Sequence, residues 1–143
     1  MYELLRIYEK VKMSEELRRK DLVYPELSYK IIEILFEVFN ELGPGLQERY
    51  YQSAIAVRLK QIDLPYAQEV RVPLDFKSSN IGSYFLDFLI DGKVILEIKR
   101  GSRFLRQNID QVVGYLKASK KKLGIIANFT NNVVKYKRIL NLY

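Results

Sequence analysis

Two apolar segments joined by a tight turn constrain the fold of this chain more than any other feature of its sequence. Ser83–Ile90 (SYFLDFLI) and Lys93–Lys99 (KVILEIK) are apolar at most positions, which is typical of strands covered on both faces of a sheet. Asp91-Gly92 lies between them and favours a β-hairpin turn. The sequence therefore predicts two adjacent antiparallel strands inside a layered α/β domain.

Charged residues interrupt both segments. Asp87 lies within the first segment, and Glu97 and Lys99 lie within the second. Burying a charge without a partner is costly, so these groups should pair with each other or bind a cation. Because side chains alternate along a strand, Glu97 and Lys99 should share one face.

The length of the hairpin loop decides whether Asp87 joins that face. A two-residue loop at Asp91-Gly92 would turn Asp87 away from Glu97. A three-residue loop, in which Leu89 pairs with Lys93, would bring both carboxylates to the same side. We predict this loop or an equivalent bulge.

The remaining segments predict helices on both sides of a mixed sheet. The expected order is α-α-β-β-β-α-β followed by one weak element, in an α/β fold. The predicted helices span residues 26–42, 46–61 and 104–119, the further strands span 67–76 and 123–129, and 133–140 is an edge strand or a last helix. Residues 1–24 are expected to form a charged N-terminal extension, and residues 25–143 a single domain.

The absence of two residue types excludes several kinds of chemistry. The chain has no histidine and no cysteine, which excludes imidazole acid–base catalysis, thiolate nucleophiles and thiolate zinc sites. Carboxylates, lysine, tyrosine and hydroxyls remain, and carboxylate oxygens favour Mg²⁺, Mn²⁺ or Ca²⁺. With no secretory signal and no apolar run of membrane length, a cytoplasmic location is expected.

Several motifs together resemble one known superfamily. Asp87 followed, after nine residues, by Glu97-Ile98-Lys99 resembles the D…(D/E)xK motif of the PD-(D/E)XK nuclease superfamily. Gly45–Tyr51 (GLQERYY) matches the pattern that names the GxxExxY protein family within that superfamily, and Gln111–Tyr115 (QVVGY) resembles the QxxxY helix motif of RecB-type exonucleases. The resemblance covers about residues 26–140, and it includes Leu27–Lys30 (LSYK), Asn40–Gly43 (NELG) and Asn128-Phe129.

The resemblance implies a restriction-endonuclease-like fold and a metal-dependent nuclease. Mg²⁺ (or Mn²⁺) would be bound by Asp87, Glu97 and the backbone carbonyl of Ile98, in order to hydrolyse phosphodiester bonds of DNA or RNA with little base specificity. Lys99 would orient the attacking water or stabilise charge on the phosphate. Glu48 would be an additional acidic residue of the metal site.

The helix motif supplies two further candidates, and each candidate has a structural alternative. Gln111 and Tyr115 lie one turn apart on one helix face and would steady the metal site or the nucleic-acid backbone, although core and surface roles remain open for them. Asp87 can instead form a buried ion pair with Lys99. Glu48 can simply favour a helix N-terminus through the helix dipole.

Positive charge is concentrated in the C-terminal part of the chain. Residues 1–92 carry 12 Lys/Arg and 15 Asp/Glu, whereas residues 93–143 carry 12 Lys/Arg against Glu97 and Asp110 alone. This asymmetry favours a face that binds a polyanion, with a solvated lysine-rich surface as the alternative. The candidate nucleic-acid contacts are Arg100, Arg103, Arg106 and Lys117.

Other functions remain open at this point. The same fold can serve as a catalytically silent module that binds nucleic acid or a protein partner, or as an accessory subunit with a basic docking face. A homodimer is also compatible with the sequence. Met13 is a plausible start, so we expect residues 1–12 to be dispensable.

Overall fold

The elements follow the predicted order. The computed structural model describes residue 7 and residues 23–143; the predicted extension, including residues 1–12 except Ile7, lies mostly outside them. The last weak element is a strand. The elements are α2 (Pro25–Leu42), α3 (Glu48–Gln61), β1 (Tyr66–Phe76), β2 (Ser79–Ile90), β3 (Val94–Arg100), α4 (Arg106–Ser119), β4 (Leu123–Phe129) and β5 (Val134–Leu140).

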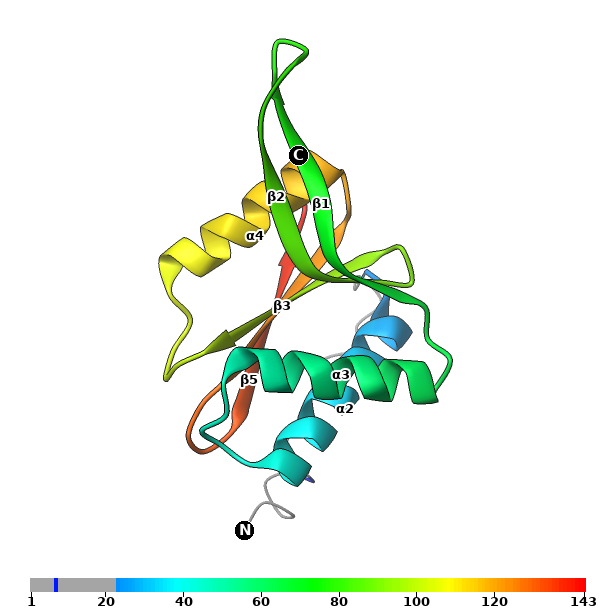
Figure 1. Cartoon of the computed structure of the whole chain (residues 1–143), viewed down its shortest axis with the longest axis vertical. Coiled ribbons are helices and arrows are strands. Elements are labelled where there is room, and N and C mark those ends of the chain that lie inside the picture. Colours follow the sequence, from blue (N-terminus) through cyan, green and yellow to red (C-terminus); the bar gives the residue numbers. More distant parts are fainter. Residues whose placement is uncertain (1–6, 8–22) are drawn as a thin grey trace.

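The strands form one five-stranded mixed sheet in the order β1-β2-β3-β4-β5. β3 and β4 are parallel and are connected through α4, whereas all other neighbouring strands are antiparallel. The long β1–β2 hairpin projects beyond the helices (Figure 1). Among the described residues, no helix is long and apolar enough to cross a membrane.

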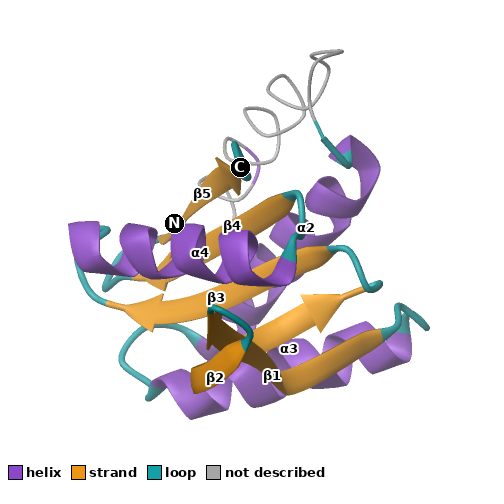
Figure 2. Ribbon diagram, turned by 90° about the horizontal axis from the view of Figure 1, so that it is seen from above, coloured by secondary structure: helices purple, strands orange, loops and turns teal. Residues whose placement is uncertain are grey.

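Helices cover both faces of the sheet (Figure 2). On one face, α2 and α3 bury a large apolar cluster against β2, β3, β4 and β5, in which Phe88, Leu96 and Ile125 are fully buried. On the other face, α4 packs on a smaller cluster that includes Ile95 and Ile126. Both faces of the central strands are thus covered, which explains why their sequences are almost continuously apolar.

A glycine lets α4 approach the sheet closely. A Cβ atom at Gly124 in β4 would lie 2.6 Å from Cγ1 of Val112 in α4, well inside van der Waals contact. The start of β4 therefore fits under α4 only without a side chain at this position. This contact fixes the depth of α4 over the face on which Glu97 lies.

The β2–β3 turn differs in register from the predicted loop. Asp91 and Gly92 both have positive φ (53° and 64°), and Lys93 N donates to Ile90 O at 3.0 Å, as in a type I′ turn. Lys93 is then an extra residue, because Ile90 pairs with Val94. The predicted pairing of Leu89 with Lys93 is wrong: Leu89 pairs with Ile95. The physical reason is that Ile90 and Val94 are both fully buried, and pairing them leaves the lysine in solvent.

Candidate active site

Asp87 and Glu97 face each other where the β2–β3 ladder ends. The last paired residues are Phe88 and Leu96, and the two acidic residues occupy the next positions. Asp87 N donates to Glu97 Oε1 at 2.8 Å, and Ile98 N donates to Asp87 Oδ2 at 2.8 Å. Each carboxylate thus accepts a hydrogen bond from the backbone of the opposite strand. The extra residue at the turn brings both carboxylates to one side of the sheet, which is the condition that the sequence analysis set for a shared site.

The outer strand is also irregular at this level. Pairing of β1 with β2 is present on both sides of Glu69 and Asp87 but not between these two residues. Glu69 has φ of 50°, a strained value for a residue with a side chain. Beyond this point Val72 and Leu86 pack against α4, whereas Tyr66 and Phe88 belong to the cluster on the opposite face. The β1–β2 hairpin therefore twists at Asp87, so that Leu86 and Phe88 face opposite sides of the sheet. Asp87 itself has no paired residue in either β1 or β3.

Burial and mutual repulsion raise the pKa of both carboxyl groups. Glu97 is 2% exposed, and loss of solvation, followed by the charge of Asp87, raises its pKa from 4.5 to about 8. The pKa of Asp87 is also raised, mainly by burial, with a smaller contribution from Glu69. Two partly desolvated carboxylates side by side are unfavourable as anions unless a cation neutralises them.

Lys99 provides part of that positive charge but does not form the predicted alternative ion pair. Its charge lowers the pKa of both Asp87 and Glu97. Among the described residues, however, no ion pair joins Lys99 to a carboxylate. A buried Asp87–Lys99 pair is therefore not what stabilises this part of the sheet.

Glu48 connects the start of α3 to the end of β3. Its Oε1 accepts a hydrogen bond from Arg100 N at 3.2 Å, one residue beyond Lys99. Glu48 is also the first residue of α3, so the favourable helix-dipole interaction is present as well. Both expectations for Glu48 are thus compatible with its position, because the side chain reaches β3 from the helix N-terminus.

Tyr51 holds the loop that carries Glu48. Its hydroxyl donates to Gly43 O at 2.7 Å and accepts from Leu46 N at 3.2 Å. Its ring is fully buried and stacks on Phe129, with the ring centroids 4.1 Å apart. Tyr51 therefore fixes the α2–α3 loop against the end of β4.

The two candidates on α4 differ in their surroundings. Tyr115 is 4% exposed, and burial, together with the charges of Glu97 and Asp87, raises the pKa of its hydroxyl. Its ring meets the Tyr84 ring edge-on at 5.0 Å. Gln111 is exposed and makes no side-chain hydrogen bond in the part of the chain that the structure describes. Tyr115 thus lies beside the carboxylates, whereas Gln111 faces solvent.

Asn128 is a polar residue beside the site that the sequence did not identify as a candidate site residue. It is 1% exposed, lies next to Lys99 in the parallel β3–β4 register, and donates to Arg103 O at 2.7 Å. Its Oδ1 is buried without a hydrogen-bond partner. A polar residue in the otherwise apolar strand LGIIANF is the sequence signal that could have identified it.

The predicted nucleic-acid contacts are all exposed, but their surroundings differ. Arg100 and Arg103 lie at the end of β3 and in the loop that follows. Arg106 pairs with Asp110 within α4 at 3.3 Å, and Lys117 lies over the Tyr143 ring at 4.6 Å. Arg100 and Arg103 are therefore the two that lie closest to Lys99 in the sequence, at the end of β3 and in the loop after it.

The donor set fits a hard divalent cation. Asp87 and Glu97 offer adjacent carboxylate oxygens whose repulsion a cation would remove, and hard cations prefer oxygen ligands. Within the described ranges, no cluster of three or more acidic side chains is preformed, so the pair would need the Ile98 carbonyl or a movement of Glu48 to complete a ligand set.

Comparison with known proteins identifies the family. The model of the PD-(D/E)XK nuclease superfamily matches residues 25–139. The chain therefore belongs to this superfamily of nucleases, whose substrates are nucleic acids and whose members generally use divalent metal ions.

One solved structure agrees with this fold. The structure titled "Crystal structure of SSO0001" has a TM-score of 0.54 and 15% identity, over 96% of this chain and 76% of that one. An alkaline exonuclease from Laribacter hongkongensis has a TM-score of 0.49 and 8% identity, over 86% and 72% of the two chains. Comparison with curated proteins gives no match. At 15% identity, the likeness to the first of these structures concerns the fold alone.

Proposed function

We propose that this chain is a divalent-cation-dependent nuclease whose reaction centre is formed by Asp87, Glu97 and Lys99. The observation that carries the proposal is the pair of facing carboxylates, fixed by reciprocal backbone hydrogen bonds of 2.8 Å. A buried acidic pair held only by strand N–H groups would contribute little to the stability of the fold, because burial and repulsion disfavour the charged carboxylates and raise both pKa values. A cation site explains why the pair is there.

Asp87, Glu97 and the backbone carbonyl of Ile98 would hold Mg²⁺ or Mn²⁺. When bound, the ion would polarise the scissile phosphate and make water more acidic. Glu48 would join through Oε2, since Oε1 is used on Arg100 N. Bound metal would also relieve the repulsion between the carboxyl groups, so it would lower their pKa values.

Lys99 and Tyr115 would act on the phosphate and the attacking water. The Lys99 ammonium would orient the water or balance charge on the phosphate, in a position where its field already reaches both carboxylates. The raised pKa of Tyr115 keeps its hydroxyl protonated near neutral pH. Tyr115 would therefore serve as a hydrogen-bond donor rather than a base. Gln111, exposed one turn away, would contact the nucleic-acid backbone.

The substrate would be DNA or RNA, recognised through its backbone. Arg100 directly follows Lys99, Arg103 lies in the loop after it, and both are exposed, which suits contact with phosphates on either side of the cut. Arg106 and Lys117 would contribute long-range attraction, as part of the +10 charge of residues 93–143. Contacts to phosphates carry no base specificity.

We also propose membership of the GxxExxY family within the superfamily. The three residues of that pattern have connected roles in the loop before α3. Gly45 adopts φ of 95°, Glu48 bonds to β3, and Tyr51 holds the loop through its hydroxyl. A sequence pattern whose three positions cooperate in one loop is what a family motif would preserve.

A cleavage assay tests the proposed activity. Labelled single- and double-stranded DNA and RNA are incubated with Mg²⁺ or Mn²⁺, and with EDTA as control. We expect metal-dependent cleavage of at least one substrate by the wild type, and its loss in Asp87→Asn and Lys99→Ala. Lys137→Ala, an exposed lysine on β5, is the matched control and should keep activity.

Three results would distinguish the alternatives. Absence of cleavage of every substrate by the wild type, or equal cleavage by the Asp87 and Lys99 variants, would refute the nuclease proposal. Binding of nucleic acid that persists without cleavage would instead favour the catalytically silent module.

A further inference from the structure

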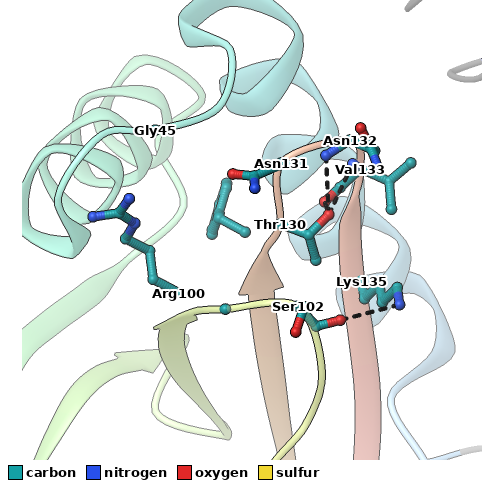
Figure 3. Close-up of a pocket in the computed structure, with 10 residues that line it drawn as sticks. Gly45, Arg100, Ser102, Thr130, Asn131, Asn132, Val133 and Lys135 are labelled. Carbon is teal, nitrogen blue, oxygen red and sulfur yellow. Dashed lines mark hydrogen bonds between the residues drawn. The ribbon is translucent and has the colours of Figure 1, made fainter.

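A polar hollow lies at the carboxyl end of the parallel strands β3 and β4, next to the candidate reaction centre. It has a volume of about 560 Å³ and lies between Gly45, the start of the β3–α4 loop and the β4–β5 turn (Figure 3). Arg100, which follows Lys99, lies on one side of it, and Lys135 of β5 lies on the other. None of its described lining residues is acidic.

Hydrogen-bond donors line this hollow without a full set of partners. In the described part of the chain, the side chains of Arg100, Asn131 and Asn132 make no hydrogen bond or ion pair. Lys135 Nζ donates to Ser102 O at 3.3 Å, which leaves two of its N–H groups unused. Two cationic residues and two amide residues therefore line this hollow, with Arg100 and Lys135 on opposite sides of it, and none of its described lining residues carries a carboxylate.

The walls of the hollow are held in place by contacts that do not use these donors. Thr130 Oγ1 donates to Val133 O at 2.7 Å and accepts from Val133 N at 3.0 Å, which fixes the β4–β5 turn. Phe129 stacks on Tyr51, the residue that holds the loop containing Gly45. A Cβ atom at Gly45 would meet nothing within 4 Å, so the space beside it is open. The two loops that line the hollow are thus each held by internal contacts, which lowers the cost of ordering them on binding.

We propose that this hollow binds a backbone phosphate of the nucleic-acid strand, next to the phosphate that is cut. The inference rests on the proposed function, which defines the cutting position. Arg100 N is bonded to Glu48, and Arg100 follows Lys99, so the hollow and the reaction centre lie at the same end of β3. Guanidinium, ammonium and amide donors are the groups that bind phosphate oxygens. Lys135 and Asn131 are the residues this assigns beyond the arginines.

Binding titrations without metal test this site separately from cleavage. Fluorescence anisotropy measures the affinity of the full chain for a short labelled single-stranded DNA, and for the RNA of the same sequence, in EDTA over a series of salt concentrations. Lys135→Gln should weaken binding about fivefold and reduce the slope of log affinity against log salt by about 0.7, the value for one phosphate contact on a single strand. Lys137→Gln removes the same charge two residues away, where the lysine lies over Phe104, and should change the affinity and the slope less than Lys135→Gln does.

A second variant and a modified substrate exclude a general charge effect. Asn131→Asp should weaken binding more than Lys135→Gln does, because it places a carboxylate at the edge of the hollow. Oligonucleotides with one uncharged methylphosphonate at a time should reveal one linkage whose neutralisation weakens wild-type binding but not Lys135→Gln binding. This coupling identifies the phosphate that Lys135 contacts.

The outcomes separate the two proposals. Equal losses in Lys135→Gln and Lys137→Gln, identical methylphosphonate profiles in wild type and Lys135→Gln, or no wild-type binding to either strand would overturn the phosphate site. If that happens while metal-dependent cleavage is observed, the nuclease assignment stands without this site. If the Lys135 effects appear without any cleavage, the phosphate site stands and the proposed catalytic activity fails.

Discussion

The substitution Tyr51→Phe tests how the loop before α3 is held. It removes a hydroxyl that donates to Gly43 O and accepts from Leu46 N, but it keeps the ring that stacks on Phe129. Each hydrogen bond contributes about 0.5–1.5 kcal/mol net, and the loop is only partly buried, so water can replace one of the two partners. We therefore expect a loss of about 1–2 kcal/mol in the free energy of unfolding. For a domain of this size, that loss lowers the melting temperature by about 3–8 °C.

The neighbouring tyrosine provides a matched control. Tyr50 is 48% exposed, and its hydroxyl accepts a hydrogen bond only from the adjacent Arg49, so Tyr50→Phe should change the unfolding free energy by less than about 0.5 kcal/mol. Chemical denaturation followed by circular dichroism measures both variants. Equal stability of Tyr51→Phe and Tyr50→Phe would refute the role assigned to the Tyr51 hydroxyl.

Two further predictions concern packing and titration. Gly124→Ala should destabilise the protein by about 1–3 kcal/mol, because its Cβ would lie 2.6 Å from Val112 Cγ1. Gly82→Ala is the control: its Cβ would meet nothing within 4 Å, so it should have little effect in the same denaturation experiment. Equal effects of the two substitutions would contradict the close packing of α4. In the metal-free protein, the pKa of Glu97 is raised from 4.5 to about 8, so its contribution to stability is fully present below about 4.5 and is lost as pH rises through about 8. Melting temperatures measured across this range should decline in the wild type more than in Glu97→Gln, and parallel profiles would contradict the raised pKa.

The sequence predicted the order of elements because the patterns behind it are local. The apolar spacing of α2 and the alternation of helical and strand segments do not depend on distant contacts. The β1–β2 hairpin was less visible: its turn, Lys77-Ser78, has positive φ at both residues but lacks the glycine that usually marks such a turn. The predicted second strand therefore began at Ser83 rather than Ser79.

The candidate site was predictable in composition but not in detail. Charged residues in buried strands identified Asp87, Glu97 and Lys99, and the need for a shared face required an odd loop or a bulge. The register itself depended on burying Ile90 and Val94 together, which is a property of the packed core.

Long-range placement explains what the sequence could not provide. The contact from Glu48 to Arg100 N spans 52 residues, and the hollow brings Gly45, Arg100 and Lys135 together from separate segments. Asn128 has its orphaned Oδ1 beside Lys99 only because β3 and β4 are parallel neighbours. Such placement follows from tertiary structure, since no local pattern specifies it.

The most direct test of the central claim is calorimetric titration of the metal-free protein with Mg²⁺ and Mn²⁺. We predict that near neutral pH the wild type binds at least one of these ions and releases protons, because Glu97 with a pKa of about 8 must lose its proton to act as a ligand. Asp87→Asn should lose this binding, and Lys99→Ala, which removes no ligand, should keep it. Failure of the wild type to bind either ion, or equal binding by Asp87→Asn, would contradict the assignment of Asp87 and Glu97 as a divalent-cation site.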